Sequence, residues 1–271
     1  MGQKKMALIN DMSGFGRCSL SVLIPIISAL KIQAVAIPTA ILSCHMQFPH
    51  YYIDDYTDKM DDYIQTYKDN HIEFDAIASG YLGSIKQADI VVDFIEHFKN
   101  EETIIIVDPV MGDHGKLYST MNDSMISKME TLIQYAHIIT PNLTELCALS
   151  HIPYNENLSL DDIRCMCEKL CQKGIKHIVV TGIKSNEFIL NYIYNHDGSD
   201  YYIGTKKIGK DRCGAGDVMT GVIAGEYLHS QDIIKSEEKA VEFTSLCIKR
   251  CEELDIPHHY GLCIEEYLTQ L

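Results

Sequence analysis

The sequence predicts an α/β fold with a mostly parallel central sheet. Short runs rich in β-branched residues, such as TIIIVDP at 103–109, alternate with longer segments of helical periodicity. Because strands that alternate with helices favour parallel pairing, the alternation predicts a sheet flanked by helices. No linker-like segment, low-complexity tract or internal repeat interrupts residues 1–271, and we therefore expect a single domain.

The first half of the chain contains four predicted strands separated by three predicted helices. The strands are 4–10, 33–39, 74–80 and 103–109, and the helices are 17–30, 54–69 and 86–99. Residues 19–30 are apolar but too short to cross a membrane, which indicates a buried helix. The acidic stretch 54–62 is compatible with a solvated helix or with a mobile flap.

The second half continues the alternation and ends in two helices. The predicted strands are 136–142 and 177–182, followed by a hairpin of 187–195 and 200–208 around the turn sequence HDGS. The predicted helices are 119–134, 143–149, 160–173, 215–229 and 236–251.

Charge and cysteine content exclude several classes of protein. The net charge of −15 disfavours general binding to nucleic acid or to anionic membranes, so any phosphate must be bound by local donors or a metal. The N-terminal MGQKKMALIND lacks the apolar core of a signal peptide. The ten cysteines include no CxxC pair, which favours reduced thiols and a cytoplasmic location.

Polar and glycine-rich segments follow the predicted strands. They are NDMSGFG (10–16), AILSCHMQF (40–48), SGYLGS (79–84), DPVMGDHG (108–115), PNLTE (141–145), TG (181–182) and DRCGAGD (211–217). Open α/β sheets bind ligands beyond the carboxyl ends of their strands. We therefore expect these segments to converge on one rim and to form the site.

The GAGD sequence predicts an anion site at the start of a helix. Gly214 and Gly216 permit close backbone approach, and a helix beginning near Ala215 would direct free N–H groups at an anion. Asp217, in the first turn, would take a proton from an attacking hydroxyl group. The alternative is a carboxylate that only complements the helix dipole. Neither a Walker A loop nor a dinucleotide-binding fingerprint occurs.

Carboxylates at neighbouring strand ends suggest a magnesium site. Asp108 and Asp113 would contact Mg²⁺, with Glu145 acting through water and Thr140 through its hydroxyl or carbonyl oxygen. The alternative is that the Asp-Pro pair starts a turn and that Glu145 caps a helix.

Taken in order, SGYLGS, DPVMGD, TPNLTE and GAGD resemble the motifs of the ribokinase superfamily, and within it those of the pyridoxal (vitamin B6) kinases. The resemblance extends from about residue 6 to residue 230, and SCHMQF at 43–48 is similar to that family's segment for the pyridine ring. It implies a three-layer α/β/α fold, usually dimeric. It also implies ATP-dependent phosphorylation of the 5′-hydroxymethyl group of pyridoxal, pyridoxamine or pyridoxine.

The resemblance also implies roles for individual residues. The catalytic set would be the base Asp217 with the anion hole Gly214, Ala215 and Gly216. Mg²⁺ and a monovalent cation, K⁺ or Na⁺, would be organised by Asp108, Asp113, Thr140 and Glu145. ATP would contact Thr181, Gly182, Lys210, Arg212, Cys213, Gly214 and Gly216, and the pyridine substrate would contact Asp11, His45, Met46, Gln47 and Tyr81.

Two positions depart from the vitamin B6 pattern. Asp11-Met12 stands where these kinases commonly carry serine-histidine, and DxSG resembles instead the hydroxymethylpyrimidine kinases of thiamin synthesis. Met46 stands where a small hydroxyl residue is common. An ionised Asp11 accepts hydrogen bonds, which suggests a preference for pyridoxamine or pyridoxine over pyridoxal. A hydroxymethylpyrimidine kinase is thus the nearest alternative, and a non-catalytic pyridoxal phosphate-binding protein is the alternative from another class.

Overall fold

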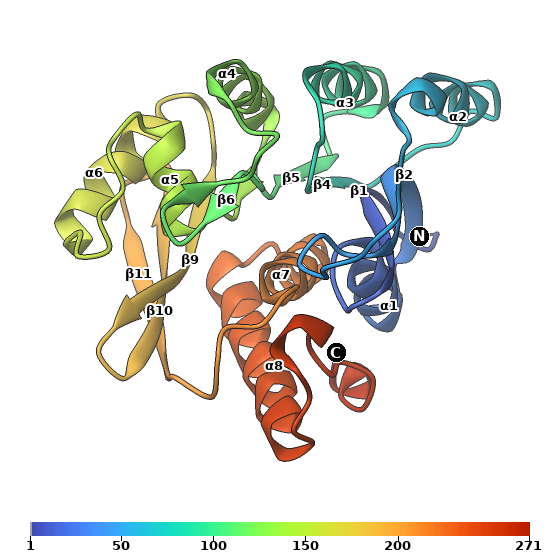
Figure 1. The fold of residues 1–271 in the computed structure, drawn as a ribbon. Coiled ribbons are helices and arrows are strands. Elements are labelled where there is room, and N and C mark those ends of the chain that lie inside the picture. Colours follow the sequence, from blue (N-terminus) through green and yellow to red (C-terminus); the bar gives the residue numbers. More distant parts are fainter. Residues whose placement is uncertain (1) are drawn as a thin grey trace.

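The computed structural model describes residues 2–271 and contains a nine-stranded sheet in the order β11-β10-β9-β8-β5-β4-β1-β2-β3 (Figure 1). The strands are β1 (Lys5–Phe15), β2 (Gln33–Cys44), β3 (Ile53–Asp55), β4 (Ala76–Ser79), β5 (Ile104–Val107), β8 (Ile138–Ile139), β9 (His177–Ser185), β10 (Phe188–Asn195) and β11 (Asp200–Lys206). The six strands from β9 to β2 are parallel. At the edges, β10 pairs antiparallel with β9, β11 with β10, and β3 with β2. The prediction of a mostly parallel sheet is confirmed.

Helices cover both faces of the sheet and complete three layers (Figure 1). One face carries α2 (Thr57–Asp69), α3 (Ile85–Phe98), α4 (Asp123–Leu132), α5 (Leu143–Leu149) and α6 (Leu160–Cys171). The other carries α1 (Leu20–Ala29), α7 (Ala215–Ser230) and α8 (Ile233–Glu253). Short 3₁₀ turns lie at Ile133–Tyr135, His258–Tyr260 and Leu268–Gln270. The expected three-layer α/β/α architecture is thus confirmed.

The strands are apolar on both faces because helices pack on both sides. In β1, Met6 and Leu8 belong to the core beneath α1 and α7, whereas Ala7 and Ile9 belong to the core on the opposite face. Across residues 2–271 no helix is both long and apolar enough to span a membrane.

Strand lengths differ from the prediction at one end of the sheet. β1 and β2 continue to Phe15 and Cys44, through segments that the sequence predicted as loops, with a register shift between Asn10 and Met12. The glycines and polar residues there are typical of turns. They nevertheless form strands, because pairing with a partner strand satisfies their backbone N–H and C=O groups. The structure also adds the edge strand β3 and a small hairpin of β6 (Gly112–Asp113) and β7 (Lys116–Leu117).

The acidic segment 54–62 also differs from the prediction, because the helix starts later than expected. Helix α2 begins at Thr57 and buries Met60 and Ile64 against the core, while Asp54 and Asp55 belong to β3. Residues 57–62 are therefore the first turns of an ordinary amphipathic helix.

Candidate active site

The start of α7 lies at the carboxyl rim of the sheet and has the geometry of an anion site. Gly214 is its N-cap residue, in the left-handed conformation with φ +75°. A side chain at Gly214 would collide with the backbone of Arg17 and would lie 3.1 Å from the Cα atom of Cys18. Only glycine fits there. The amide of Ala215 donates to the carbonyl oxygen of Arg212 at 3.4 Å, and the next first-turn N–H groups, from Gly216 onwards, point beyond the helix end. The structure therefore brings Gly214, Ala215, Gly216 and Asp217 together as predicted from the sequence.

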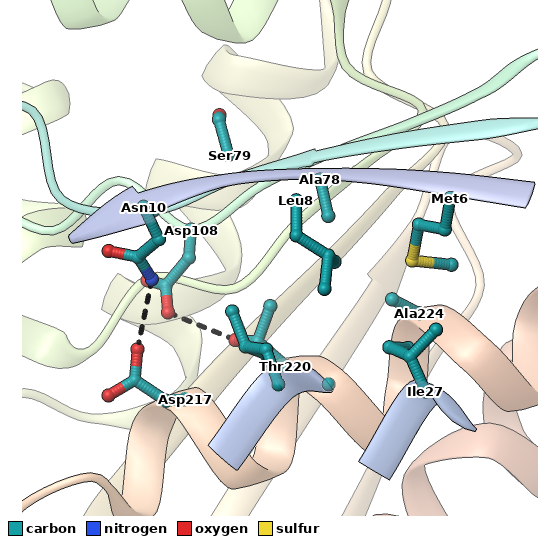
Figure 2. A pocket seen from close by; sticks show the side chains of 13 residues that line it. Met6, Leu8, Asn10, Ile27, Ala78, Ser79, Asp108, Asp217, Thr220 and Ala224 are labelled. Carbon is teal, nitrogen blue, oxygen red and sulfur yellow. Dashed lines mark hydrogen bonds between the residues drawn. The ribbon is translucent and has the colours of Figure 1, made fainter. Parts of the chain in front are cut away.

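Asp217 is held by a residue that the sequence did not indicate. The Asn10 side-chain amide donates to Oδ1 of Asp217 at 3.3 Å (Figure 2). Asn10 Oδ1 accepts from the backbone amides of Asp11 at 2.9 Å and Tyr81 at 3.0 Å, which fixes the orientation of the amide group. The only sequence signal was a polar residue directly after the apolar run at 6–9.

The pKa of Asp217 lies well above its ordinary value. Burial is the main cause, and the negative charges of Asp108 and Asp11 add to it, whereas the backbone amide of Ser19 acts in the opposite direction. A carboxylate with a raised pKa is a better proton acceptor than an ordinary aspartate near neutral pH.

A second hydrogen-bonded chain links α7 to the neighbouring strand ends. Thr220 Oγ1 donates to Oδ2 of Asp108 at 3.0 Å (Figure 2). The same hydroxyl lies 2.9 Å from Oγ1 of Thr140. Thr220 follows Asp217 by three residues and so occupies the same helix face. Burial raises the pKa of Asp108 to about 7, with the Thr220 hydroxyl opposing the rise. The sequence predicted Asp108 and Thr140 but not Thr220.

The other two predicted metal-binding residues lie differently. Glu145 is buried near Asp108, whose negative charge adds to the effect of burial in raising the pKa of Glu145, whereas Asp113 is exposed. Glu145 accepts from the backbone amides of Met111 at 3.0 Å and Asn142 at 2.8 Å, and it forms a capping box at the start of α5. Its role as a helix cap was the alternative in the sequence analysis. The Asp113 side chain is 55% exposed and lies beside His114. Among residues 2–271, no group of three or more His, Cys, Asp or Glu side chains has the arrangement of a metal site.

Of the residues predicted to bind the ring, three are buried at the rim and two are exposed. Asp11 accepts from the hydroxyls of Ser19 at 2.6 Å and Ser13 at 3.1 Å. Burial raises the pKa of the Tyr81 phenol, and the nearby negative charge of Asp11 adds to the rise. His45 is buried too, whereas Met46 and Gln47 are exposed.

The C-terminal segment completes this side of the rim, which the sequence analysis did not anticipate. His45 Nε2 lies 2.6 Å from the carbonyl oxygen of His259. The Phe48 ring packs against His259, with centroids 5.0 Å apart, and against Phe15, with centroids 5.6 Å apart. Aromatic side chains from β1, from the segment after β2 and from the C-terminal segment therefore border the predicted ring site.

The predicted nucleotide-binding residues divide into two groups. Thr181 and Gly182 lie in β9, where the amide of Gly182, with φ +71°, donates to Oδ1 of Asn191 at 2.8 Å. Lys210 is exposed. Arg212 instead contacts Glu252 at 2.6 Å and the carbonyl oxygen of Ile256 at 2.9 Å, so it anchors the end of α8 rather than facing a ligand.

Cys213 lies between the glycine turn and the ring side. The hydrogen bond from the Cys18 thiol lowers the pKa of the Cys213 thiol to about 5, and His45 acts in the same direction against the effect of burial. The ten cysteines are all free thiols.

Comparison with known proteins yields one family. The model of the family described as phosphomethylpyrimidine kinase matches residues 25–263. Pyridoxal kinase PdxY of Haemophilus influenzae is 36% identical over 115 residues, which cover 42% of this chain and 39% of that protein. The chain spans about half the length of several pyridoxal kinase sequences that it matches.

Two crystal structures from Bacteroides thetaiotaomicron, both provisionally assigned as phosphomethylpyrimidine kinase, are similar over nearly the whole chain. The rhombohedral form has a TM-score of 0.97 at 34% identity and covers 100% of this chain and 94% of that one. The orthorhombic form, which contains pyridoxal, has a TM-score of 0.92 at 32% identity and covers 99% and 95%. A pyridoxal-containing structure is thus among those most similar to this fold.

Proposed function

Since this chain belongs to the phosphomethylpyrimidine kinase family, we propose that it phosphorylates the 5′-hydroxymethyl group of a vitamin B6 vitamer with ATP. The products would be the 5′-phosphate and ADP, in salvage of pyridoxal 5′-phosphate. The observation that carries this proposal is the placement of Asp217, held by Asn10 at 3.3 Å, directly beyond the left-handed Gly214. The pyridoxal in the Bacteroides structure and the similarity to PdxY support the choice of ring.

The chemistry assigned to this arrangement is proton removal and charge stabilisation. Asp217 would accept the proton of the substrate hydroxyl group as its oxygen attacks the terminal phosphorus. The amides of Gly214, Ala215 and Gly216 would stabilise the negative charge on the transferring phosphoryl group. Asn10 would keep the carboxylate of Asp217 aimed at the hydroxyl group.

We assign the nucleoside part of ATP to an apolar groove between β11 and α8. The groove is lined by Ile203, Thr205, Ile208, Glu238, Val241, Glu242, Ser245, Leu246 and Lys249. It borders the segment that leads into the glycine turn, so a base bound there would extend its phosphates toward α7. Thr181, Gly182 and Lys210 would contact the nucleotide from the opposite side, and Cys213 would line the turn.

Whether Mg²⁺ fits this site depends on the oxygen ligands that the side chains offer. Asp108 is nearly fully buried and has a pKa raised to about 7 by burial, so a neighbouring cation would favour its ionised form. Asp108 and Thr140 therefore fit an ion held mainly by water and phosphate oxygens, and the buried Glu145 near Asp108 could contact it through water, whereas Asp113 is exposed beside His114. Mg²⁺ would neutralise phosphate charge. A monovalent cation, K⁺ or Na⁺, is proposed only by family resemblance.

Substrate phosphorylation tests the proposal. Pyridoxal, pyridoxamine, pyridoxine and hydroxymethylpyrimidine are offered with ATP to the wild-type protein and to Asp217→Asn. We expect turnover of at least one B6 vitamer and a loss of about two to four orders of magnitude in kcat for the variant. Absence of B6 turnover would refute the proposal, and an undiminished Asp217→Asn rate would remove the assigned base.

The second candidate, a hydroxymethylpyrimidine (phosphate) kinase, is favoured by the family description and by the DxSG sequence at Asp11. The same assay separates the two, because they differ in the preferred ring. A non-catalytic pyridoxal phosphate-binding protein would need neither the oriented base nor the glycine turn. We further propose a cytoplasmic homodimer, which light scattering of the purified protein would test.

A further inference from the structure

Thr220 in α7 uses its hydroxyl group differently from other hydroxyl residues in the helices. Thr131, Ser230 and Ser236, for example, each donate to the carbonyl oxygen four residues earlier in the chain, as helical serine and threonine often do. The Thr220 hydroxyl instead donates to Oδ2 of Asp108 at 3.0 Å, across 112 residues of sequence. This bond joins α7 to the sheet at the carboxyl rim.

The two partners of Thr220 are fixed from the sheet. Asp108 and Thr140 directly follow the neighbouring parallel strands β5 and β8. The backbone amide of Asp108 donates to the carbonyl oxygen of Ser79 at 2.9 Å. That of Thr140 donates to the carbonyl oxygen of Val107 at 3.2 Å. All three side chains of the bonded chain are buried, so their polar groups depend on one another for partners.

The direction of the hydrogen bonds follows from the number of protons. A threonine hydroxyl has one proton to donate, and an ionised carboxylate can only accept. Because the Thr220 proton goes to Asp108, Oγ1 of Thr140, 2.9 Å away, must donate its own proton to Thr220. The Thr140 oxygen is then left with lone pairs alone. Asp108 receives this one side-chain hydrogen bond from residues 2–271, which leaves Oδ1 for a ligand.

We propose that Thr220 is a positioning residue for the divalent cation, because its hydroxyl group holds Asp108 and orients the Thr140 hydroxyl so that both offer oxygen lone pairs. Such oxygens are the ligands that Mg²⁺ and its bound water prefer. The inference rests on the proposed function, since the ion is the one that would accompany ATP. Groups that bond to a metal's ligands typically change metal affinity by about 10- to 100-fold. Thr220 follows Asp217 by three residues, so one turn of α7 would serve both the base and the cation.

Thr220→Val and Thr220→Ser test the role of the hydroxyl group, because valine keeps the shape of threonine without the donor and serine keeps the donor. Thr244→Val is the matched control. Thr244 is also buried, and its hydroxyl donates to the sulfur atom of Met219 at 3.1 Å and not to the strand ends. The readout is Mn²⁺ binding in the presence of a non-hydrolysable ATP analogue, followed by electron paramagnetic resonance of the free ion, which needs no turnover.

We expect Thr220→Val to weaken Mn²⁺ binding by about 10-fold or more, whereas Thr220→Ser and Thr244→Val should stay close to the wild type. Binding of the analogue in the presence of EDTA should not differ between the proteins. In kinetic assays, the Mg²⁺ concentration for half-maximal rate should rise in Thr220→Val by the same factor as the Mn²⁺ dissociation constant. The KM for the ring substrate should not change.

Mn²⁺ binding by Thr220→Val that equals that of the wild type would overturn the proposal. An equal loss in Thr220→Ser or in Thr244→Val would overturn it too, since packing and not the hydroxyl group would then be the cause. If Thr220→Val does not fold, Thr220→Ala takes its place in the same comparison. Mn²⁺ binding that depends on Thr220 supports the proposal even in a protein that phosphorylates none of the offered substrates, a result that would refute the kinase function alone. A wild-type protein that binds no Mn²⁺ would overturn the role of Thr220.

Discussion

The side-chain amide of Asn10 lies 3.3 Å from Oδ1 of Asp217, across 207 residues of sequence. The other end of the amide accepts two backbone N–H groups, so Asn10 cannot turn its oxygen to the carboxylate without losing both bonds. A side chain at Gly80 would displace Asn10, which explains the glycine at that position. Asn10 in the middle of β1 and the loop that follows β4 therefore orient the assigned base in α7.

Replacing Asn10 should reduce catalysis more than stability. In Asn10→Ala the carboxylate of Asp217 loses a donor, and we expect kcat to fall by about 10- to 100-fold, the effect of one hydrogen bond to a charged group. Steady-state kinetics with a fixed vitamer would measure this. Asn191→Ala is the comparison variant, since Asn191 bonds to Gly182 and should alter the KM for ATP instead. Equal kcat values for Asn10→Ala and the wild type would contradict the assignment.

The pH dependence of kcat should reflect the raised pKa of Asp217. The base works when ionised, and burial together with nearby carboxylates raises its pKa well above that of an ordinary aspartate. We therefore expect kcat to fall as the pH is lowered through this raised pKa, at a higher pH than for an exposed carboxylate. Rate profiles between pH 4 and 9 would show it, and a rate that stays flat down to the ordinary range of aspartate would contradict it.

Glu237 should reduce stability as the pH rises. It is fully buried in α8, and no hydrogen bond of standard geometry reaches its carboxyl oxygens from the described part of the chain, although Asn191 lies beside it. Burial raises its pKa from 4.5 to about 8. Between these values the folded state keeps a proton that the unfolded state has released, so stability present below pH 4.5 is lost by about pH 8.

Glu237→Gln should therefore raise the melting temperature by a few degrees at pH 8 and much less at pH 5. The neighbouring Glu238→Gln is the control, since Glu238 is exposed and should behave like the wild type at both values. Thermal unfolding at the two pH values measures the difference, and an equal gain at both would rule out titration of Glu237 as its cause.

Asp11 should influence the choice of vitamer. An ionised carboxylate would favour pyridoxamine or pyridoxine over pyridoxal, and Asp11→Asn should weaken that preference while keeping an acceptor for one of the two serines, Ser13 or Ser19, that bond to different oxygens of Asp11. The kcat/KM values for the three vitamers test this. A clear preference for pyridoxal that is unchanged in Asp11→Asn would contradict the hypothesis.

Local sequence patterns predicted most of the helices and strands and the site residues that lie next to glycine turns. Buried strands such as β5 and helices such as α6 were recognisable because periodicity is a property of consecutive residues. The extension of β1 to Phe15 was missed, because it depends on pairing with β2 rather than on the strand's own composition. Arg212 was predicted to face ATP because its positive charge stands next to the glycine turn in the sequence. Its ion-pair partner Glu252 lies 40 residues away, so the sequence did not show that pairing.

The sequence by itself determined the α/β fold, the rim at which the polar strand ends meet and the chemistry available there. The reason is that GAGD, DPVMGD and SGYLGS, and their order after successive strands, can be recognised from consecutive residues. Only the tertiary structure decided which of those groups meet. It joined Asp217 to Asn10, and Asp108 to Thr140 through Thr220. The reason is physical: a buried polar group must find a partner, and which partner is within reach depends on how the sheet and helices pack.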